Sequence, residues 1–156
     1  IFAQDNVRIL SGLYGVLKPL DLMLPYRLEM GTRLENKNGK NLYEFWGDSL
    51  SETISSELDT HKDKVVINCA SNEYFKSIDN EALGVSVITP EFKEIKNGKT
   101  RMISFFAKKA RGMMARFIVE NRIDFSEKIL DFNMAGYKFD QSLSSQGKPV
   151  FTRIQP

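Results

Sequence analysis

The residues with the clearest chemical potential lie between Ser104 and Arg122, where the sequence reads SFFAKKARGMMARFIVENR. Lysine and arginine pair with phosphate and carboxylate groups, and arginine can do so through two parallel hydrogen bonds. Between Arg101 and Arg122 there are six Lys or Arg residues and one acid, Glu120, which gives a local net charge of +5. The whole chain carries only +2. This concentration of positive charge predicts an anionic partner.

The same segment has the periodicity of an amphipathic α-helix over 104–122. Apolar residues recur at the spacing of a helix face that packs on a core, and they are Phe106, Ala110, Met113, Met114 and Phe117. At about 100° per residue, Lys108, Arg111 and Arg122 fall on the opposite side, and Lys109 and Arg116 flank the apolar face. We therefore expect Lys108, Lys109, Arg111 and Arg116 to form an anion-binding surface. The alternative is an ordinary solvated helix that binds nothing.

Glycines mark two places where the backbone itself could contact a ligand. Gly112 lies in the middle of the expected helix, where glycine costs about 1 kcal/mol relative to alanine, so its presence suggests close approach to the backbone. Gly12 and Gly15, in LSGLYG, lack the GxxxxGK[ST] pattern of a phosphate-binding P-loop. Their spacing is compatible with the turn of a helix-hairpin-helix module, whose backbone amides contact DNA phosphates, and with a plain structural turn.

A second group of polar residues follows a short β-branched segment, 64–70, which we expect to form a central strand buried on both faces. Ligand sites are common beyond the carboxyl end of such a strand. The polar residues at this end are Asn68, Ser71, Glu73, Tyr74 and Lys76. They form a candidate pocket, although Ser71 could instead cap a short helix and Lys76 could simply be exposed.

Other catalytic and metal sites find little support. His61 is the only histidine and lies in the charged segment THKDK, which indicates a solvated loop rather than a held catalytic base. Glu44, Asp48 and Glu52 belong to the polar side of an expected helix. With one histidine and one cysteine, Cys69, the chain predicts no zinc site, no internal disulfide and no cofactor. We expect Cys69 to be buried and inert.

The elements that must position these residues mix strands and helices, which predicts an α+β fold with a mixed β-sheet flanked by helices. At 156 residues, 42% of them hydrophobic, the chain fits a single domain, 1–156, with a substantial core. No segment approaches the roughly 20 apolar residues that span a bilayer, and no signal peptide begins the chain, so we expect no membrane partner. In the first half of the chain we expect a strand entering a tight loop in 7–17, helical turns in 18–30, a helix capped by Asn41 and ending near Leu58, and a strand in 64–70. A short helix should follow Ser71, and a β-hairpin should turn at Asn97-Gly98. The last expected elements are the cationic helix 104–122, a short helix in 125–132 capped by Ser126, and a closing hairpin in 137–154 around 144–147.

Four segments carry a family resemblance: LSGLYGVLKPLDLMLPYRLEMGTRLEN, LYEFWGD, VVINCASNEYFKS and ISFFAKKARGMMARFIVENR. Together they resemble the YaaA family of bacterial peroxide-stress proteins, in order from about Arg8 to Arg153. Members of that family ordinarily begin with a segment carrying an I-S-P-A-K-T type motif, which does not occur here. We therefore expect the chain to be the C-terminal portion of a longer protein, and residues 1–156 alone to be poorly soluble because an apolar strand would lose its neighbours.

The resemblance implies a cytoplasmic protein that protects cells during hydrogen peroxide stress and affects intracellular iron. It also implies DNA binding through a positively charged cleft with a helix-hairpin-helix-like element, in a compact α+β fold peculiar to the family. Carried onto this sequence, the cleft would draw on Lys108, Lys109, Arg111 and Arg116, with Arg27 and Lys76 as further candidates. Cys69 departs from the small or aliphatic residue expected at its place in the motif.

Three classes of function follow from these observations. The first is DNA binding mainly through phosphates, which would depend steeply on salt and little on sequence. The second is an enzyme acting on a nucleotide or another small anionic metabolite in the same cleft, and the third is a module that docks an acidic protein. Exposed Phe or Tyr side chains beside lysine would favour nucleic acid, whereas a closed pocket with buried carboxylates would favour catalysis.

Overall fold

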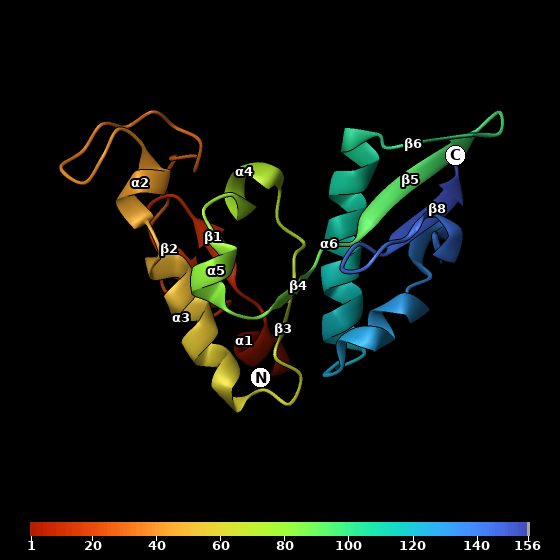
Figure 1. The fold of residues 1–156 in the computed structure, drawn as a ribbon, viewed down its shortest axis with the longest axis horizontal. Coiled ribbons are helices and arrows are strands. Elements are labelled where there is room, and N and C mark those ends of the chain that lie inside the picture. Colours follow the sequence, from red (N-terminus) through yellow and green to blue (C-terminus); the bar gives the residue numbers. More distant parts are fainter. Residues whose placement is uncertain (156) are drawn as a thin grey trace. The chain divides into compact units, whose positions relative to one another are not determined.

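The computed structural model describes residues 1–155, and it divides into two compact units (Figure 1). Unit 1 consists of Ile1–His61 and Ala70–Val85, and unit 2 consists of Lys62–Cys69 and the residues from Ser86 onward. Both units contain helices and strands, so the predicted α+β fold class is confirmed. The prediction that 1–156 form a single domain stays a prediction.

Unit 1 begins with a short helix and a β-hairpin. The helix is α1 (Phe2–Asn6), and the hairpin pairs β1 (Ile9–Ser11) with β2 (Gly15–Leu17) in antiparallel register. Gly15 has φ +76°, and a Cβ atom there would lie 3.0 Å from the Trp46 ring. The predicted strand and tight loop are therefore confirmed, but the residues on both sides of this turn are strands, so the helix-hairpin-helix expectation is wrong at this place.

The helices of unit 1 follow capping signals closely. Asn41 caps α2 (Leu42–Trp46) as predicted, because its side-chain oxygen accepts a hydrogen bond from the Glu44 amide at 2.9 Å. The predicted single helix to Leu58 is instead two helices, α2 and α3 (Ser49–Glu57), followed by a 3₁₀ turn, η1 (Leu58–Thr60). Gly47 separates them with φ +49° and ψ −130°, which lies outside the helical region.

The rest of unit 1 contains two four-residue helices and a long irregular segment. The helices are α4 (Asn72–Phe75), whose predicted cap by Ser71 is confirmed, and α5 (Asn80–Leu83). Residues 18–30 contain no helix, so that expectation is wrong. Within that segment Met30 is fully buried, whereas Leu22 is 98% exposed. The segment is therefore attached to unit 1 at specific points rather than by an amphipathic helix face.

The main sheet lies in unit 2 and has the strand order β6-β5-β8-β7. β5 (Glu91–Lys96) and β6 (Lys99–Arg101) form the predicted hairpin, in which Asn97 and Gly98 both have positive φ, as a type I′ turn requires. β8 (Val150–Ile154) runs parallel to β5 and antiparallel to β7 (Lys138–Phe139). The sheet is therefore mixed, as predicted.

A separate two-stranded sheet in unit 2 joins β3 (Val65–Ile67) in parallel with β4 (Ser86–Ile88). The strand prediction for 64–70 is confirmed, but the expected central position is wrong, because β3 pairs with one strand and its residues are only half-buried. Three 3₁₀ helices complete the unit: η2 (Ser126–Asp131), η3 (Met134–Gly136) and η4 (Gln141–Leu143). Ser126 does not cap η2 with its side chain; its amide donates to Asp63 instead.

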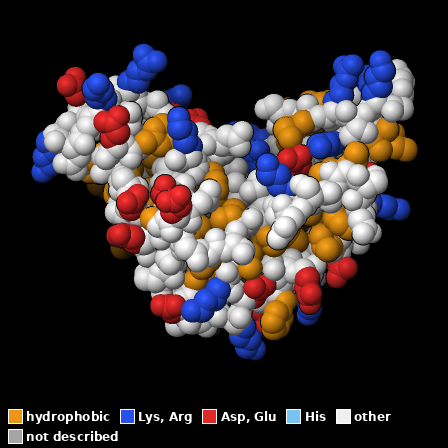
Figure 2. Space-filling model, viewed as in Figure 1, with side chains coloured by type: hydrophobic (Ala, Val, Ile, Leu, Met, Phe, Trp, Pro, Cys, Tyr) orange, Lys and Arg blue, Asp and Glu red, His pale blue; other side chains and the backbone are white. Residues whose placement is uncertain are grey.

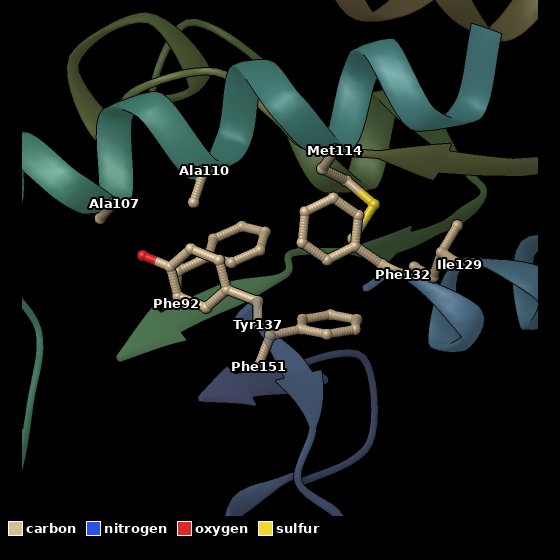
Figure 3. Close-up of a cluster of buried hydrophobic side chains, with 8 residues drawn as sticks. All are labelled: Phe92, Ala107, Ala110, Met114, Ile129, Phe132, Tyr137 and Phe151. Carbon is tan, nitrogen blue, oxygen red and sulfur yellow. The ribbon is translucent and has the colours of Figure 1, made fainter. Parts of the chain in front are cut away.

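The core of unit 2 forms where α6 (Ser104–Glu120) packs on aromatic side chains from the sheet and its connections (Figure 3). The helix contributes Ala107, Ala110 and Met114, which point from one side of α6 toward the rings. The rings belong to Phe92, Phe132, Tyr137 and Phe151. The two alanines leave room for these large side chains, and the Phe92 and Phe151 rings stack with centroids 5.5 Å apart. Along residues 1–155, no helix combines the length and the apolar character that crossing a bilayer requires.

Candidate functional site

Only two of the four cations predicted on α6 line the same hollow. Lys109 and Arg116 line a hollow in unit 2, whereas Lys108 is exposed and lies outside that lining. Arg111 is half-buried, and its Nε atom is enclosed without a hydrogen-bond partner among the described residues. Arg122 follows the end of the helix with φ +47° and belongs to no helix face.

The placement of Arg111 corrects the sequence prediction, which put it opposite the apolar face. The fully buried positions are Ala107, Ala110 and Met114, whereas Phe106 and Phe117 are only half-buried. The buried stripe is therefore rotated toward Arg111, which follows Ala110 by about 100° around the helix. This rotation places the Arg111 side chain at the edge of the packed face.

An open hollow of about 500 Å³ lies along the other flank of α6. The helix contributes Phe106, Lys109, Gly112, Met113 and Arg116 to its lining, and Ala135 of η3 and Arg153 of β8 complete it. The charged side chains of this lining are all cationic: Lys109, Arg116 and Arg153. Arg116 also pairs with Glu120 on the next helical turn, with Nε 2.7 Å from Oε1. The hollow is thus suited to an anionic ligand.

Arg153, which lines this hollow, is held by several contacts. Its Nε donates to both carboxylate oxygens of Glu94, at 2.9 and 3.1 Å, and its Nη1 donates to the Ala135 carbonyl at 3.2 Å. Its guanidinium carbon lies 4.4 Å from the Tyr137 ring centroid and 5.0 Å from that of Phe106. These contacts fix the orientation of the guanidinium group.

Glu94 is the buried carboxylate of this network, with 2% of its surface exposed. It accepts hydrogen bonds from Arg153 and from the Tyr137 hydroxyl. Burial, together with the hydrogen bond to Glu94, raises the pKa of Tyr137. The hydrogen bonds of the Glu94 carboxylate go to Tyr137 and Arg153. We therefore interpret Glu94 as a residue that holds Arg153 in place.

An exposed aromatic side chain lies next to the cations of α6. Phe105 is 61% exposed, and the Lys109 Nζ atom lies 4.5 Å from its ring centroid. The Phe105 ring also contacts Phe106 of the hollow edge-on, at 5.7 Å between centroids. A lysine beside an exposed phenylalanine is the arrangement that we expected to favour nucleic acid.

Positive charge extends from α6 to the β5–β6 hairpin, whose Lys96, Lys99 and Arg101 are exposed. Figure 2 shows Lys and Arg side chains gathered over the tip of this hairpin. Residues 96–119 contain seven cations and no acid. Sequence reasoning counted Arg101 with the cationic segment but missed Lys96 and Lys99, although the absence of acidic residues over 96–119 marks them. It also missed Arg153, which stands alone in its segment of the sequence.

The candidate pocket after the predicted strand is divided between the units. Asn68 belongs to unit 2, where it is buried and its Nδ2 lies 3.3 Å from the Thr89 hydroxyl. Ser71, Glu73, Tyr74 and Lys76 belong to unit 1, as does the exposed Arg27.

In unit 1, Glu73 and Tyr74 attach the irregular segment to α4. The Glu73 carboxylate accepts from the Gly31 amide at 2.9 Å, and the Tyr74 hydroxyl donates to Glu29 at 2.6 Å. The hydrogen bond to Glu29, together with burial, raises the pKa of Tyr74 to about 12. Lys76 lies over the Tyr43 ring, with Nζ 5.1 Å from its centroid. These contacts favour a structural role for the group.

The Cys69 thiol and possible metal ligands are two further places where chemistry could occur. Cys69 is half-buried rather than fully buried as predicted. Loss of solvent around the thiol still raises its pKa to about 11, against the opposing effect of the nearby Arg111 charge, so the thiol is protonated near neutral pH. Within residues 1–155, no three His, Cys, Asp or Glu side chains come together in a way that could hold a metal ion.

The fold and the site define a small α+β protein whose cations concentrate on one helix and one hairpin. The family model described as peroxide stress protein YaaA matches residues 1–143. The chain therefore belongs to this family, and membership supports a role in the response to oxidative stress. The predicted resemblance is confirmed, and the matched range includes α6 and the β5–β6 hairpin.

Proposed function

We propose that this protein binds DNA mainly through its phosphates, using α6 and the β5–β6 hairpin of unit 2. The observation that carries this proposal is the exposed Phe105 ring with Lys109 against it, beside an open hollow whose charged lining residues are all cations. Aromatic and cationic side chains presented together can bind both the bases and the backbone of nucleic acid.

The distribution of charge supports the same proposal. Unit 2 contains 15 Lys and Arg residues against 8 Asp and Glu, a net charge of +7, whereas unit 1 contains 7 against 12, a net charge of −5. A basic unit attracts the phosphate backbone over distances of about a Debye length, near 10 Å. The helix contains no Asn or Gln, the residues that read adenine edges, so we expect little sequence preference.

In this proposal the protein acts in the bacterial cytoplasm and covers DNA during peroxide stress. Family membership supports the connection with peroxide, and the cationic surface supplies the means of contact with DNA. A nucleotide-processing enzyme is the weaker candidate, because Glu73, Tyr74 and Glu94 already hold other parts of the protein in place. The effect on intracellular iron stays a prediction from the resemblance.

The test is a salt titration of duplex DNA binding with two matched double variants. Lys108→Ala with Lys109→Ala removes two exposed cations of α6, and Lys128→Ala with Lys138→Ala removes two exposed cations elsewhere in unit 2. The first pair should weaken binding and flatten the slope of log affinity against log salt by about one unit for each phosphate that is no longer neutralised. The control pair should stay close to wild type. Equal affinity and slope for both pairs would remove α6 from the proposed interface.

A further inference from the structure

We propose that the hollow beside α6 is a pocket for a single phosphate group, with Arg153 as its main recognition residue. This inference rests on the proposed binding of DNA phosphates and names the place where one of them is held. The recognised chemistry is a phosphate group, whether it belongs to DNA or to a free nucleotide.

Arg153 is prepared for this role by the contacts that immobilise it. Nε donates to Glu94 and Nη1 donates to the Ala135 carbonyl, and the Tyr137 and Phe106 ring centroids lie 4.4 and 5.0 Å from the guanidinium carbon. Nη2 makes no hydrogen bond to the described residues, so its donors are available to a ligand in the hollow that Arg153 lines. An arginine already fixed in place loses little conformational entropy on binding.

Two further cations converge on the same hollow. Lys109 and Arg116 are both exposed and both contribute to the lining, on successive turns of α6. Arg116 uses Nε for Glu120, which leaves the rest of its guanidinium group for other partners. Arg116 and Arg153 keep their ion pairs with Glu120 and Glu94, so they offer a phosphate group mainly their remaining N–H donors. Lys109 adds a positive charge to the same lining.

Gly112 supplies an independent observation. It lines the hollow, and a Cβ atom built at this position would meet no other atom within 4 Å. Packing therefore does not require glycine here, although glycine weakens the interior of a helix. The missing side chain keeps the hollow open against the helix and leaves room for a phosphate group beside Lys109 and Arg116.

The first test measures inorganic phosphate binding by titration calorimetry on wild type and three variants. Gly112→Leu fills the hollow without changing the charge, and Arg153→Lys keeps the ion pair with Glu94 but removes the second donor group of the guanidinium. As a control, Lys128→Ala removes an exposed cation that lies outside the lining. The first two should weaken phosphate binding about tenfold or more, the loss expected for a charge-assisted hydrogen bond. Lys128→Ala should bind as wild type. Gly112→Leu should melt no lower than wild type, so a loss of binding cannot be attributed to unfolding.

The second test identifies the source of the phosphate group, with duplex DNA and adenosine monophosphate as probes. A loss of DNA affinity in Gly112→Leu assigns the pocket to the DNA backbone, whereas a loss confined to adenosine monophosphate assigns it to a nucleotide. Wild-type affinity for all three probes in both Gly112→Leu and Arg153→Lys would overturn the pocket. That result would leave the proposed function intact if Lys108→Ala with Lys109→Ala still weakened DNA binding, so the two failures are distinguishable.

Discussion

The Tyr74 hydroxyl shows how single hydrogen bonds hold the irregular segment of unit 1. It donates to Glu29 at 2.6 Å, and residues 18–30 have no helix of their own to stabilise them. Together with the bond from the Gly31 amide to Glu73, it ties this segment to α4. We therefore interpret Glu73 and Tyr74 as residues that attach a loop, and the sequence hypothesis of a pocket at these positions stays a prediction.

A pH titration tests this interpretation. Because the hydrogen bond to Glu29 and burial raise the pKa of Tyr74 from 10 to about 12, the protonated phenol is favoured in the folded protein. Its stabilising effect is complete below pH 10 and is lost as the pH rises toward 12. Glu29→Gln should bring the pKa of Tyr74 back toward 10, as followed by ultraviolet difference titration with Tyr74→Phe as the reference. An unchanged titration would show that the bond to Glu29 does not form in solution.

At the scale of the elements, the same substitution should have opposite effects at two glycines. Gly112→Ala adds a methyl group to a helix position with open space around it, and should raise the free energy of unfolding by up to about 1 kcal/mol. Gly98 has φ +70° in the turn between β5 and β6, so Gly98→Ala should lower it by about 1–2 kcal/mol. Urea denaturation of both variants measures the difference. If both variants changed stability in the same direction, the helical or the turn conformation would be wrong.

The elements that the sequence predicted well are those with local signals. Asn41 and Ser71 accept the backbone hydrogen bonds expected of caps, and Asn97-Gly98 forms the expected turn. The errors arise where tertiary contacts decide. Gly47 divides a periodic segment into two helices, and residues 18–30 are held by side chains distant in the sequence.

The candidate site was predictable only where it lies on one helix. Lys109 and Arg116 follow from the charge pattern of α6, and both line the hollow. Arg153 could not be found in this way, because it faces Glu94 through the parallel pairing of β5 with β8. Nothing local to either residue predicts that pairing, since a parallel connection spans a long intervening sequence.

At the scale of the whole molecule, charge is divided unequally between the two units. Unit 2 carries a net charge of +7, from 15 cations and 8 acids, and unit 1 carries −5, from 7 cations and 12 acids. The small net charge of the whole chain, +2, therefore conceals a strongly basic part. Since phosphate binding depends on local cation density, we expect unit 2 to supply most of the affinity for DNA.

This expectation separates the two sets of cations that the family resemblance assigned to one surface. Arg27 and Lys76 lie in the acidic unit 1, and Lys76 already lies over the Tyr43 ring. Arg27→Ala with Lys76→Ala should therefore weaken DNA binding less than Lys108→Ala with Lys109→Ala, although each pair removes two positive charges. The salt slope should flatten by about one unit for each phosphate that loses its cation, and so by less in the unit 1 pair. Equal reductions of affinity and slope would show that both units bind the DNA backbone to a similar extent, and would contradict an interface built mainly on α6 and the β5–β6 hairpin.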